Sequence, residues 1–277
     1  MRTTVTVVVA LALILSAMAI AQDAEAPAEA VEEVAEEQPQ AMQAGERVQD
    51  ELIALYRFDN VIEGTIIPDA TQEFGGLDLM IQGAYQGTPV EVRDGAVHLS
   101  GVQEAGIPGV FSTAPATDIV NSIQASGQIT LEAWVTPAAD NLTGPARIVT
   151  ISHDTAQRNI TLGQHQDAYA LRMRTSVTDG QGSPEVHTPE GSLRVNELQH
   201  VVVTFDGQTT VIYVDGEPVY EAVDRAGSFE NWDGSMHLGI GNEIDGNRRW
   251  LGSVHLVAFY AYALSPAQVR MNFDAGF

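Results

Sequence analysis

The sequence predicts an all-β fold, and two runs near its C-terminus carry most of that prediction. Residues 200–206 and 209–215 are rich in β-branched and aromatic side chains, which favour strands. Each run ends in Asp-Gly, at 206–207 and 215–216, the pair that best supplies the positive φ angles of a tight hairpin turn. Most positions of both runs are apolar, which is typical of strands covered on both faces. We therefore expect consecutive antiparallel strands in a two-sheet sandwich.

Strand-like runs recur between turn signals from Leu52 to the C-terminus. The expected strands span residues 52–58, 77–82, 90–93, 96–100, 128–136, 146–153, 168–176, 198–206, 209–215, 218–223, 235–240 and 251–262. Asp94-Gly95 predicts another tight hairpin turn, between residues 90–93 and 96–100. One helix is expected, at the end of the chain, because Ser265, Pro266 and Gln268 have the pattern of an N-cap, a proline in the first turn and a capping box. This helix should end near Asp274.

Two segments precede the expected domain, which spans residues 52–277. Residues 1–21 have the pattern of a secretory signal peptide, because Arg2 precedes an apolar stretch that ends in Ala19-Ile20-Ala21. We expect cleavage before Gln22, with an uncleaved membrane anchor as the alternative. Residues 22–51 contain ten acidic residues and one arginine, and are expected to form a flexible, disordered spacer. The protein is thus expected to be exported to the periplasm, the cell surface or the medium, with no membrane insertion after cleavage.

The composition limits the partners that the protein can have. The chain has 13 basic residues, all of them arginine, and 37 acidic residues, which give a net charge of −24. This charge argues against nucleic acid and anionic membranes as partners, because phosphate contacts need cationic patches. It fits a well-solvated acidic surface better than a set of cation-binding carboxylates. Cysteine is absent, so an exported domain would have to be stable without disulfides, which favours a bacterial source.

Several blocks of the sequence stand in a specific order. They include the strand with Glu132 and Trp134 (129–135), the hairpin of residues 200–216, His237-Leu-Gly-Ile-Gly241 and the segment 263–269. In order and spacing, these blocks resemble the laminin G-like jelly-roll domains of the concanavalin A-like lectin and glucanase superfamily. The resemblance implies a two-sheet antiparallel jelly-roll sandwich with a short C-terminal helix. Leu198 replaces the tryptophan that usually precedes the hairpin histidine, but this change leaves the expected fold intact.

The sequence gives no sign of a catalytic site. Glucanases of the superfamily carry two Glu and one Asp on one strand, whereas Glu243-Ile-Asp245 lacks the second Glu and lies in a Gly- and Asn-rich turn. No cysteine and no G-x-S-x-G motif is present, and the seven histidines are scattered. His153 and His165, each near an aspartate, could suggest a metal cluster, but structural roles are favoured. We therefore expect a protein that is not an enzyme.

Two groups of residues are candidates for binding. Arg172 and Arg174 alternate with core-type residues on one expected strand, so both side chains should lie on the same face and could contact acidic or hydroxyl-rich polysaccharide. Trp232, in a polar loop, is the expected stacking platform, whereas Trp134 and Trp250 are assigned to the core. The alternative for the arginines is pairing with Asp or Glu on neighbouring strands.

Calcium is the expected cofactor, because the resembling jelly-rolls often bind a hard cation through carboxylates and backbone carbonyls. Asp59 and Asp69 are the candidate ligands, and turn formation is the alternative role for both. Together these features predict an exported, non-catalytic recognition module, a lectin-like domain that binds carbohydrate with help from calcium. A domain of the cell envelope that binds protein is the alternative, and a polysaccharide-degrading enzyme is less favoured.

Overall fold

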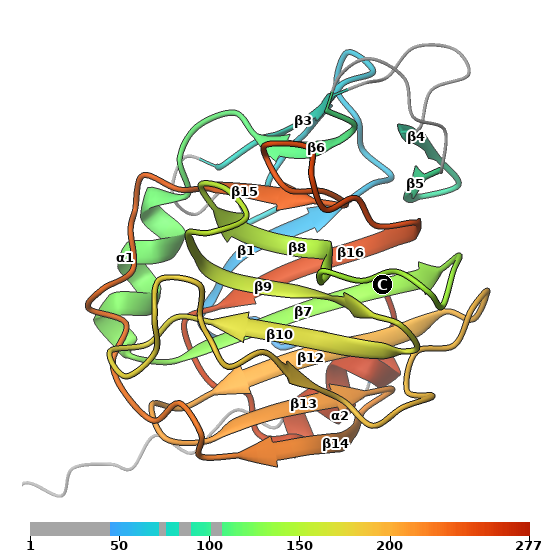
Figure 1. Ribbon diagram of the computed structural model, residues 1–277. Helices are drawn as coiled ribbons and strands as arrows, with labels where there is room; N and C mark the ends of the chain where they lie inside the picture. The colour runs from blue at the N-terminus through green and yellow to red at the C-terminus, as the bar shows by residue number, and fades with distance from the viewer. Residues whose placement is uncertain (1–44, 72–75, 83–89, 101–106) are drawn as a thin grey trace, which may run out of the picture. The chain divides into compact units, whose positions relative to one another are not determined.

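The computed structural model describes residues 45–71, 76–82, 90–100 and 107–277, so the expected signal peptide lies outside the described residues. Two antiparallel sheets pack face to face, as the ribbon in Figure 1 shows. Sheet A contains β1 (Leu52–Arg57), β4 (Val90–Arg93), β5 (Ala96–Leu99), β7 (Ile129–Pro137), β12 (Gln199–Phe205), β13 (Thr210–Val214), β14 (Glu217–Ala222) and β16 (Gly252–Tyr260). Sheet B contains β2 (Ile66–Ile67), β3 (Leu79–Gln82), β6 (Gly109–Ser112), β8 (Ala146–Ser152), β9 (Arg158–His165), β10 (Ala168–Met173), β11 (Val186–His187) and β15 (His237–Ile240). The predicted all-β sandwich is confirmed.

The order of strands places late segments of the chain beside early ones. Sheet A runs β14-β13-β12-β7-β16-β5-β4, with β1 also paired to β16. Sheet B runs β11-β10-β9-β8-β15-β6-β3-β2. The strand β16 therefore lies inside sheet A. It pairs with β7 on one side, and on its other side it pairs with β5 through its first residues and with β1 through its last residues.

All three predicted hairpins form, and two of their three turns have the predicted geometry. Asp94 and Gly95 have φ angles of 53° and 71°, and Asp215 and Gly216 have 53° and 81°, as a tight turn with two positive φ angles requires. The third turn is longer than expected. Asp206 uses its carboxylate to accept hydrogen bonds from the backbone N–H groups of residues 208 and 209, at 2.9 and 2.7 Å.

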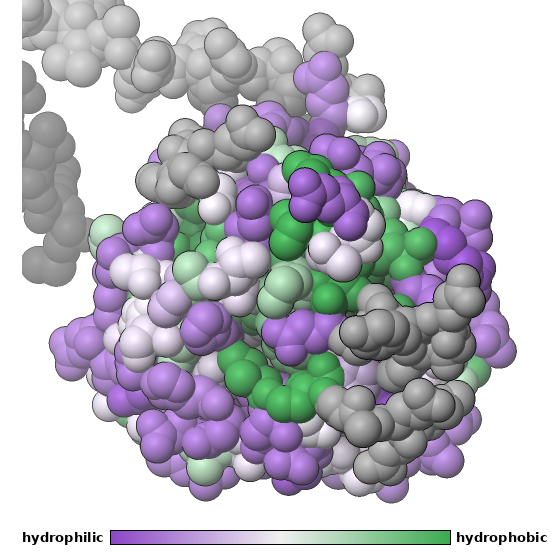
Figure 2. All heavy atoms as spheres, turned by 90° about the horizontal axis from the view of Figure 1, so that it is seen from above, coloured by the Kyte–Doolittle hydropathy of each residue, from purple (hydrophilic) through white to green (hydrophobic). Residues whose placement is uncertain are grey.

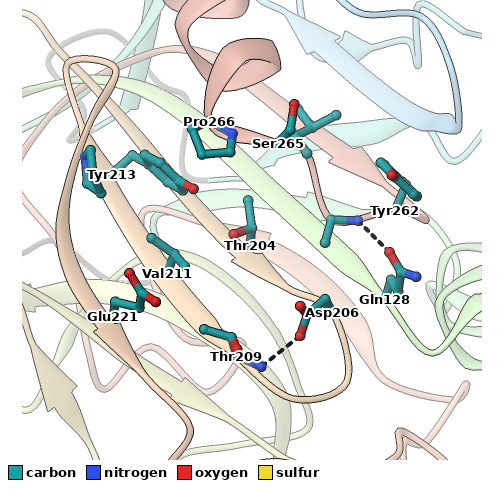
Figure 3. A pocket seen from close by; sticks show the side chains of 13 residues that line it. Gln128, Thr204, Asp206, Thr209, Val211, Tyr213, Glu221, Tyr262, Ser265 and Pro266 are labelled. Carbon is teal, nitrogen blue, oxygen red and sulfur yellow. Dashed lines mark hydrogen bonds between the residues drawn. The ribbon is translucent and has the colours of Figure 1, made fainter. Parts of the chain in front are cut away.

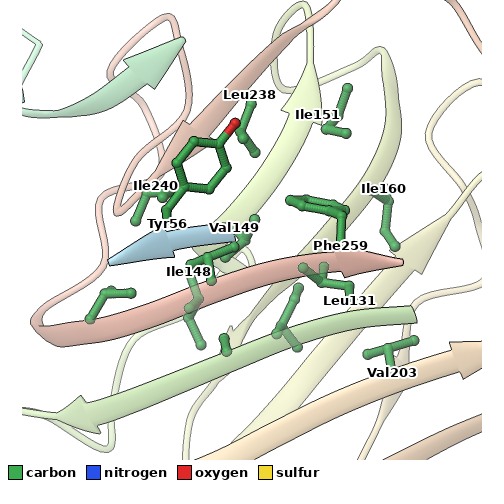
Figure 4. Close-up of a cluster of buried hydrophobic side chains, with 14 of the residues drawn as sticks. Tyr56, Leu131, Ile148, Val149, Ile151, Ile160, Val203, Leu238, Ile240 and Phe259 are labelled. Carbon is green, nitrogen blue, oxygen red and sulfur yellow. The ribbon is translucent and has the colours of Figure 1, made fainter. Parts of the chain in front are cut away.

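The main core lies between the two sheets. Its side chains come from alternate positions of the strands, because successive residues of a strand point to opposite faces. Figure 4 shows Leu131, Val203 and Phe259 from sheet A facing Ile151 and Ile160 from sheet B. All five of these side chains are fully buried, so this layer supplies the apolar burial that stabilises the sandwich.

A second apolar cluster lies on the outer face of sheet A, beneath the helix α2 (Pro266–Ala275). The helix has the predicted capping box, with Ser265 and Gln268 bonded reciprocally. Residues 45–51 also belong to this packed unit, although they were assigned to the flexible spacer. Val48 is only 1% exposed, and its N–H donates to Asn272 Oδ1 at 2.9 Å. The folded part therefore begins before Leu52, because this segment covers apolar surface that the sheet and the helix leave open.

A buried carboxylate connects the elements of this second cluster. Glu132 of β7 is fully buried and accepts hydrogen bonds from Arg47 Nη1 at 2.5 Å, His200 Nε2 at 2.8 Å and Asn272 Nδ2 at 2.8 Å. Burial alone would raise the pKa of Glu132, but the hydrogen bonds and charges of His200 and Arg47 outweigh it and lower the pKa to about 2. The charged network holds the N-terminal segment and the C-terminal helix against the sheet.

The structure contains a helix that the sequence analysis missed. The helix α1 (Thr117–Ser126) packs Ile119, Val120 and Ile123 into the core. It begins after Ala116, whose side chain cannot cap a helix, and ends at Gly127 with a φ angle of 69°. Asp118 stands in the first turn, but without a capping side chain the start signal of this helix is weak. Neither described helix, at 10 residues each, has the length and apolar character needed to cross a bilayer.

Apolar side chains also reach the surface at one end of the unit. Figure 2 shows this end, where apolar groups gather between hydrophilic ones. In β3 and the segment that leads to β6, Met80 is 38% exposed and Ile107 is 36% exposed. The high net negative charge of the chain therefore does not make every surface of the unit hydrophilic.

Candidate functional site

The described part of the chain has an open groove of about 520 Å³ on the outer face of sheet A. Its walls are β12, β13 and β14 on one side and residues 262–266, which lead into α2, on the other (Figure 3). Ligand pockets commonly have volumes of about 300–1,000 Å³. The groove is therefore large enough for a small ligand, and it lies on the face of sheet A that turns away from the main core.

The alternation of the strands decides which side chains line this groove. In β12, Val203 and Phe205 point into the core, so Thr204 points outward. In β13, Ile212 points inward and Tyr213 outward. The same period-two pattern that builds the core therefore places Thr204 and Tyr213 on the groove side of sheet A, where both form the floor of the groove and are almost fully buried.

The groove combines aromatic and polar groups. Tyr262 is 43% exposed at its rim, and Figure 3 shows it on the opposite side from Tyr213. Burial raises the pKa of Tyr213, against a lowering by its hydrogen bond with Thr204, and the charge of Glu221 adds a smaller increase. Gln128 accepts a hydrogen bond from the N–H of Ala263 at 3.1 Å. The lining can both pack against an apolar surface and exchange hydrogen bonds with hydroxyl groups.

Arg172 lies on the outer face of β10, on the other sheet, whereas β10 ends at Met173 and Arg174 follows it outside the strand. Arg172 Nε lies 2.6 Å from Glu185 Oε2, and Glu185 immediately precedes β11, the strand that pairs with β10. This is the pairing with a carboxylate of a neighbouring strand that was the alternative role for the arginines. Among the described residues, no carboxylate lies within ion-pairing distance of Arg174. Hydrogen bonds from Ser235 lower the pKa of Asp233, and the charge of Arg174 adds a smaller lowering. One of the two predicted ligand contacts is thus already engaged by a carboxylate.

The prediction for Trp232 is wrong. The indole is only 5% exposed, lies 4.6 Å from the Phe229 ring, and donates from Nε1 to the carbonyl of Arg174 at 2.6 Å. Gln124 of α1 bonds to the carbonyls of both Phe229 and Trp232 and holds this loop against the sandwich. The polar neighbours in sequence therefore face outward while the tryptophan fills the core, so it offers no stacking platform.

The assignments of the other two tryptophans to the core are confirmed. Trp134 is 6% exposed and stacks on Phe273 of α2 with ring centroids 5.7 Å apart. Trp250 is fully buried and donates to Gln164 Oε1 at 2.8 Å. Neither ring is open to a ligand.

The candidate calcium ligands occupy different environments. Asp69 is 4% exposed, and its Oδ1 accepts hydrogen bonds from the N–H of Leu55, the N–H of Thr71 and the Thr71 hydroxyl, at 3.0, 3.0 and 2.9 Å. This is the turn-forming role that aspartate favours by itself. Asp59 is exposed just after β1. The turn interpretation therefore accounts for the contacts of Asp69, and a calcium ion at this pair stays a prediction.

A family match agrees with the two-sheet sandwich. Residues 111–270 match the Laminin_G_3 family of the concanavalin A-like lectin/glucanases superfamily, a match over more than half of the chain. The chain belongs to this superfamily. No curated protein sequence matches it significantly.

Solved structures resemble this laminin G-like domain at low sequence identity. Trypanosoma rangeli sialidase in complex with sialic acid has a TM-score of 0.57 at 16% identity, over 80% of this chain and 32% of the sialidase. A structure of botulinum neurotoxin type C, described in terms of cell entry through two ganglioside molecules, has a TM-score of 0.60 at 13% identity, over 81% of this chain and 51% of that chain. The laminin G-like domain thus spans a third to a half of these structures, and the likeness shows a shared fold.

The laminin G-like domain also holds a charged cluster that the sequence analysis missed. Arg147 of β8 is fully buried and donates from Nε to Glu243 at 2.9 Å, and Ser152 donates to the same carboxylate. Burial and the nearby charges of Arg147 and Arg172 lower the pKa of Arg158 to about 10. Glu243 lies in a loop, as expected, but its carboxylate is used to hold Arg147. These residues are far apart in sequence, and no local pattern identifies the cluster.

Proposed function

We propose that this laminin G-like domain is a non-catalytic recognition module that binds carbohydrate in the groove of sheet A. The observation that carries the proposal is the groove itself, which combines the exposed ring of Tyr262 at its rim with the partly exposed polar side chains of Gln128 and Thr209. Sugars present apolar C–H faces and many hydroxyls, so they match a lining that offers both kinds of contact. The neurotoxin structure of the same fold, which is described with ganglioside molecules, supports this class of ligand.

The charge of the groove favours a neutral ligand. Asp206 and Glu221 contribute carboxylates to its lining, whereas the lining contains no arginine. An acidic sugar would be repelled by these carboxylates, so we propose a neutral, hydroxyl-rich glycan for this site. The strip around Arg174 on sheet B is the competing location, and it would favour an acidic glycan.

Three further parts of the proposal rest on the sequence. We propose that the protein is exported by way of the N-terminal signal, that it has no enzymatic activity, and that calcium at Asp59 and Asp69 assists its stability. The catalytic carboxylate pattern of the related glucanases is missing, and the carboxylate of Glu243 is engaged by Arg147.

A glycan-array screen tests the proposal, run with calcium and again with a chelator. We expect Tyr262→Ala to weaken glycan binding about tenfold, which corresponds to about 1.4 kcal/mol. Tyr262→Phe is the matched control, because it keeps the ring and removes only the hydroxyl. The double variant Arg172→Ala/Arg174→Ala should bind as well as the unmodified chain.

The possible results separate the alternatives. Loss of binding in the arginine variant, with no effect of Tyr262→Ala, would move the site to sheet B. A blank array for the unmodified chain under both conditions would contradict carbohydrate binding and favour the protein-interaction role.

A further inference from the structure

Two histidines meet on the outer face of sheet B, away from the groove. His165 ends β9 and His187 ends β11, and the strand between them is β10. His165 is paired with Ala168 and His187 with Ala170, so only small side chains stand between the two imidazoles. The rings stack across β10 with centroids 4.7 Å apart and planes inclined by 22°.

A carboxylate completes this group. Glu185 Oε1 lies 2.8 Å from His187 Nε2 and 3.6 Å from His165 Nδ1. Its other oxygen, Oε2, accepts a hydrogen bond from Arg172 Nε at 2.6 Å. The arginine therefore fixes the carboxylate with one oxygen turned toward both histidines.

One nitrogen of this group is left without a partner. His165 Nδ1 is buried and makes no hydrogen bond within the described part of the chain. A buried polar atom without a partner is costly, and each such atom calls for an explanation. Glu185 Oε1 lies 3.6 Å from this nitrogen, too far for a hydrogen bond, so an ion between the two atoms would give Nδ1 a partner.

We propose that His165, Glu185 and His187 bind a divalent transition-metal ion of the zinc class. The three ligand atoms lie within 4.8 Å of one another. Tetrahedral zinc with bond lengths of about 2.0–2.1 Å separates its ligand atoms by about 3.3 Å. The two separations from Glu185, 2.8 and 3.6 Å, lie on either side of that value, and the histidine nitrogens lie within 4.8 Å of each other, so rotation of the two rings would bring all three ligand atoms around one ion.

The donor set selects the kind of metal. Two imidazole nitrogens and one carboxylate oxygen suit zinc, copper, nickel or cobalt, whereas calcium prefers oxygen ligands alone. Three protein ligands leave a fourth position for water or an external ligand. Arg172 is a positioning residue, because it holds the carboxylate through the oxygen that does not face the histidines. The site is separate from the proposed calcium site and from the groove of sheet A.

Zinc titration of the untagged chain by calorimetry tests the proposal. We expect one zinc ion per chain, and at least tenfold weaker binding for His165→Ala and for His187→Ala. Arg172→Gln should weaken binding about tenfold, as loss of an outer hydrogen bond to a ligand does. His153→Ala is the matched control, because His153 lies 3.8 Å from Asp233 but belongs to no three-ligand cluster among the described residues. It should leave zinc affinity unchanged.

A second measurement guards against misfolded variants. Each variant should unfold at the same temperature as the unmodified chain when a chelator is present. Zinc should stabilise the unmodified chain and His153→Ala equally, Arg172→Gln less, and His165→Ala and His187→Ala least. Calcium should not displace the zinc. If the unmodified chain binds no zinc, or if His165→Ala and His187→Ala bind it as tightly, the three residues form only a hydrogen-bonded charge cluster and the proposal is wrong.

Discussion

Replacing Glu132 with glutamine tests the buried network under α2. The substitution keeps the shape of the side chain and removes its charge. Arg47 and His200, which donate to the carboxylate at 2.5 and 2.8 Å, then face a neutral amide. Removing one charge from a buried group of paired charges lowers the stability of the fold, because the remaining charges stay buried without a partner of opposite sign.

The size of the effect follows from the pKa of Glu132. In the folded protein the pKa is lowered from its ordinary value of 4.5 to about 2, so the unfolded chain binds the proton more tightly. The charged carboxylate therefore stabilises the fold above pH 4.5, and this contribution is lost as the pH falls from 4.5 toward 2. A pKa shift of that size corresponds to a contribution of about 3 kcal/mol to the free energy of unfolding at neutral pH.

Urea unfolding at pH 7, 5, 4 and 3 measures this contribution. We expect Glu132→Gln to lower the free energy of unfolding by about 3 kcal/mol at pH 7, a shift in midpoint of about 1 M urea for a slope near 3 kcal/mol/M. The difference between the two proteins should shrink below pH 4.5. Glu217→Gln is the matched control, because Glu217 pairs with Arg270 of α2 at 3.3 Å on the exposed surface. Its effect should stay below about 1 kcal/mol.

Two results would refute this reasoning. A difference that stays constant from pH 7 to pH 3 would mean that the charge of Glu132 is not its source. No difference at pH 7 would mean that the network of Glu132, Arg47 and His200 does not stabilise the fold.

The remaining predictions concern a core residue, a helix cap and the calcium site. Trp232→Ala should lower the free energy of unfolding by about 3–5 kcal/mol in urea, because it empties a buried site, and an effect on glycan binding alone would contradict that burial. Ser265→Ala should lower it by about 1 kcal/mol, measured in the same way, and no change would mean that the capping box does not stabilise α2. Calcium should raise the melting temperature of the unmodified chain more than that of Asp59→Ala, and equal increases would exclude Asp59 as a ligand.

The sequence predicted those parts of the fold whose signals are local. The Asp-Gly turns at 94–95 and 215–216 need two positive φ angles, and Ser265 with Gln268 forms a cap within four residues, so each signal lies in one short segment. The strand β9 (158–165) was missed, although its Ile160 and Leu162 face the core. Its first residues contain a bulge, which breaks the alternation that a strand pattern requires.

The sites depend on contacts that no local pattern contains. Arg47 and Glu132 are 85 residues apart, and the groove joins β12 and β13 to residues 262–266. The burial of Trp232 depends on α1, a helix without a capping side chain. Prediction from sequence therefore succeeded for the sandwich and its hairpins and failed for the stacking residue, because side-chain burial is decided by segments that meet only in the folded chain.

The position of β16 has a consequence for how the chain reaches its fold. Among the described strands, β1 has β16 as its only strand partner, and the β4–β5 hairpin joins sheet A through the same strand. A ribosome makes about 5–20 residues per second, so β1 is complete about 10–40 s before residues 252–260 have been added. Until then its backbone groups have no partner in the sheet. The sandwich therefore closes only after nearly the whole domain has been synthesised, and a chain interrupted before β16 keeps an open sheet edge.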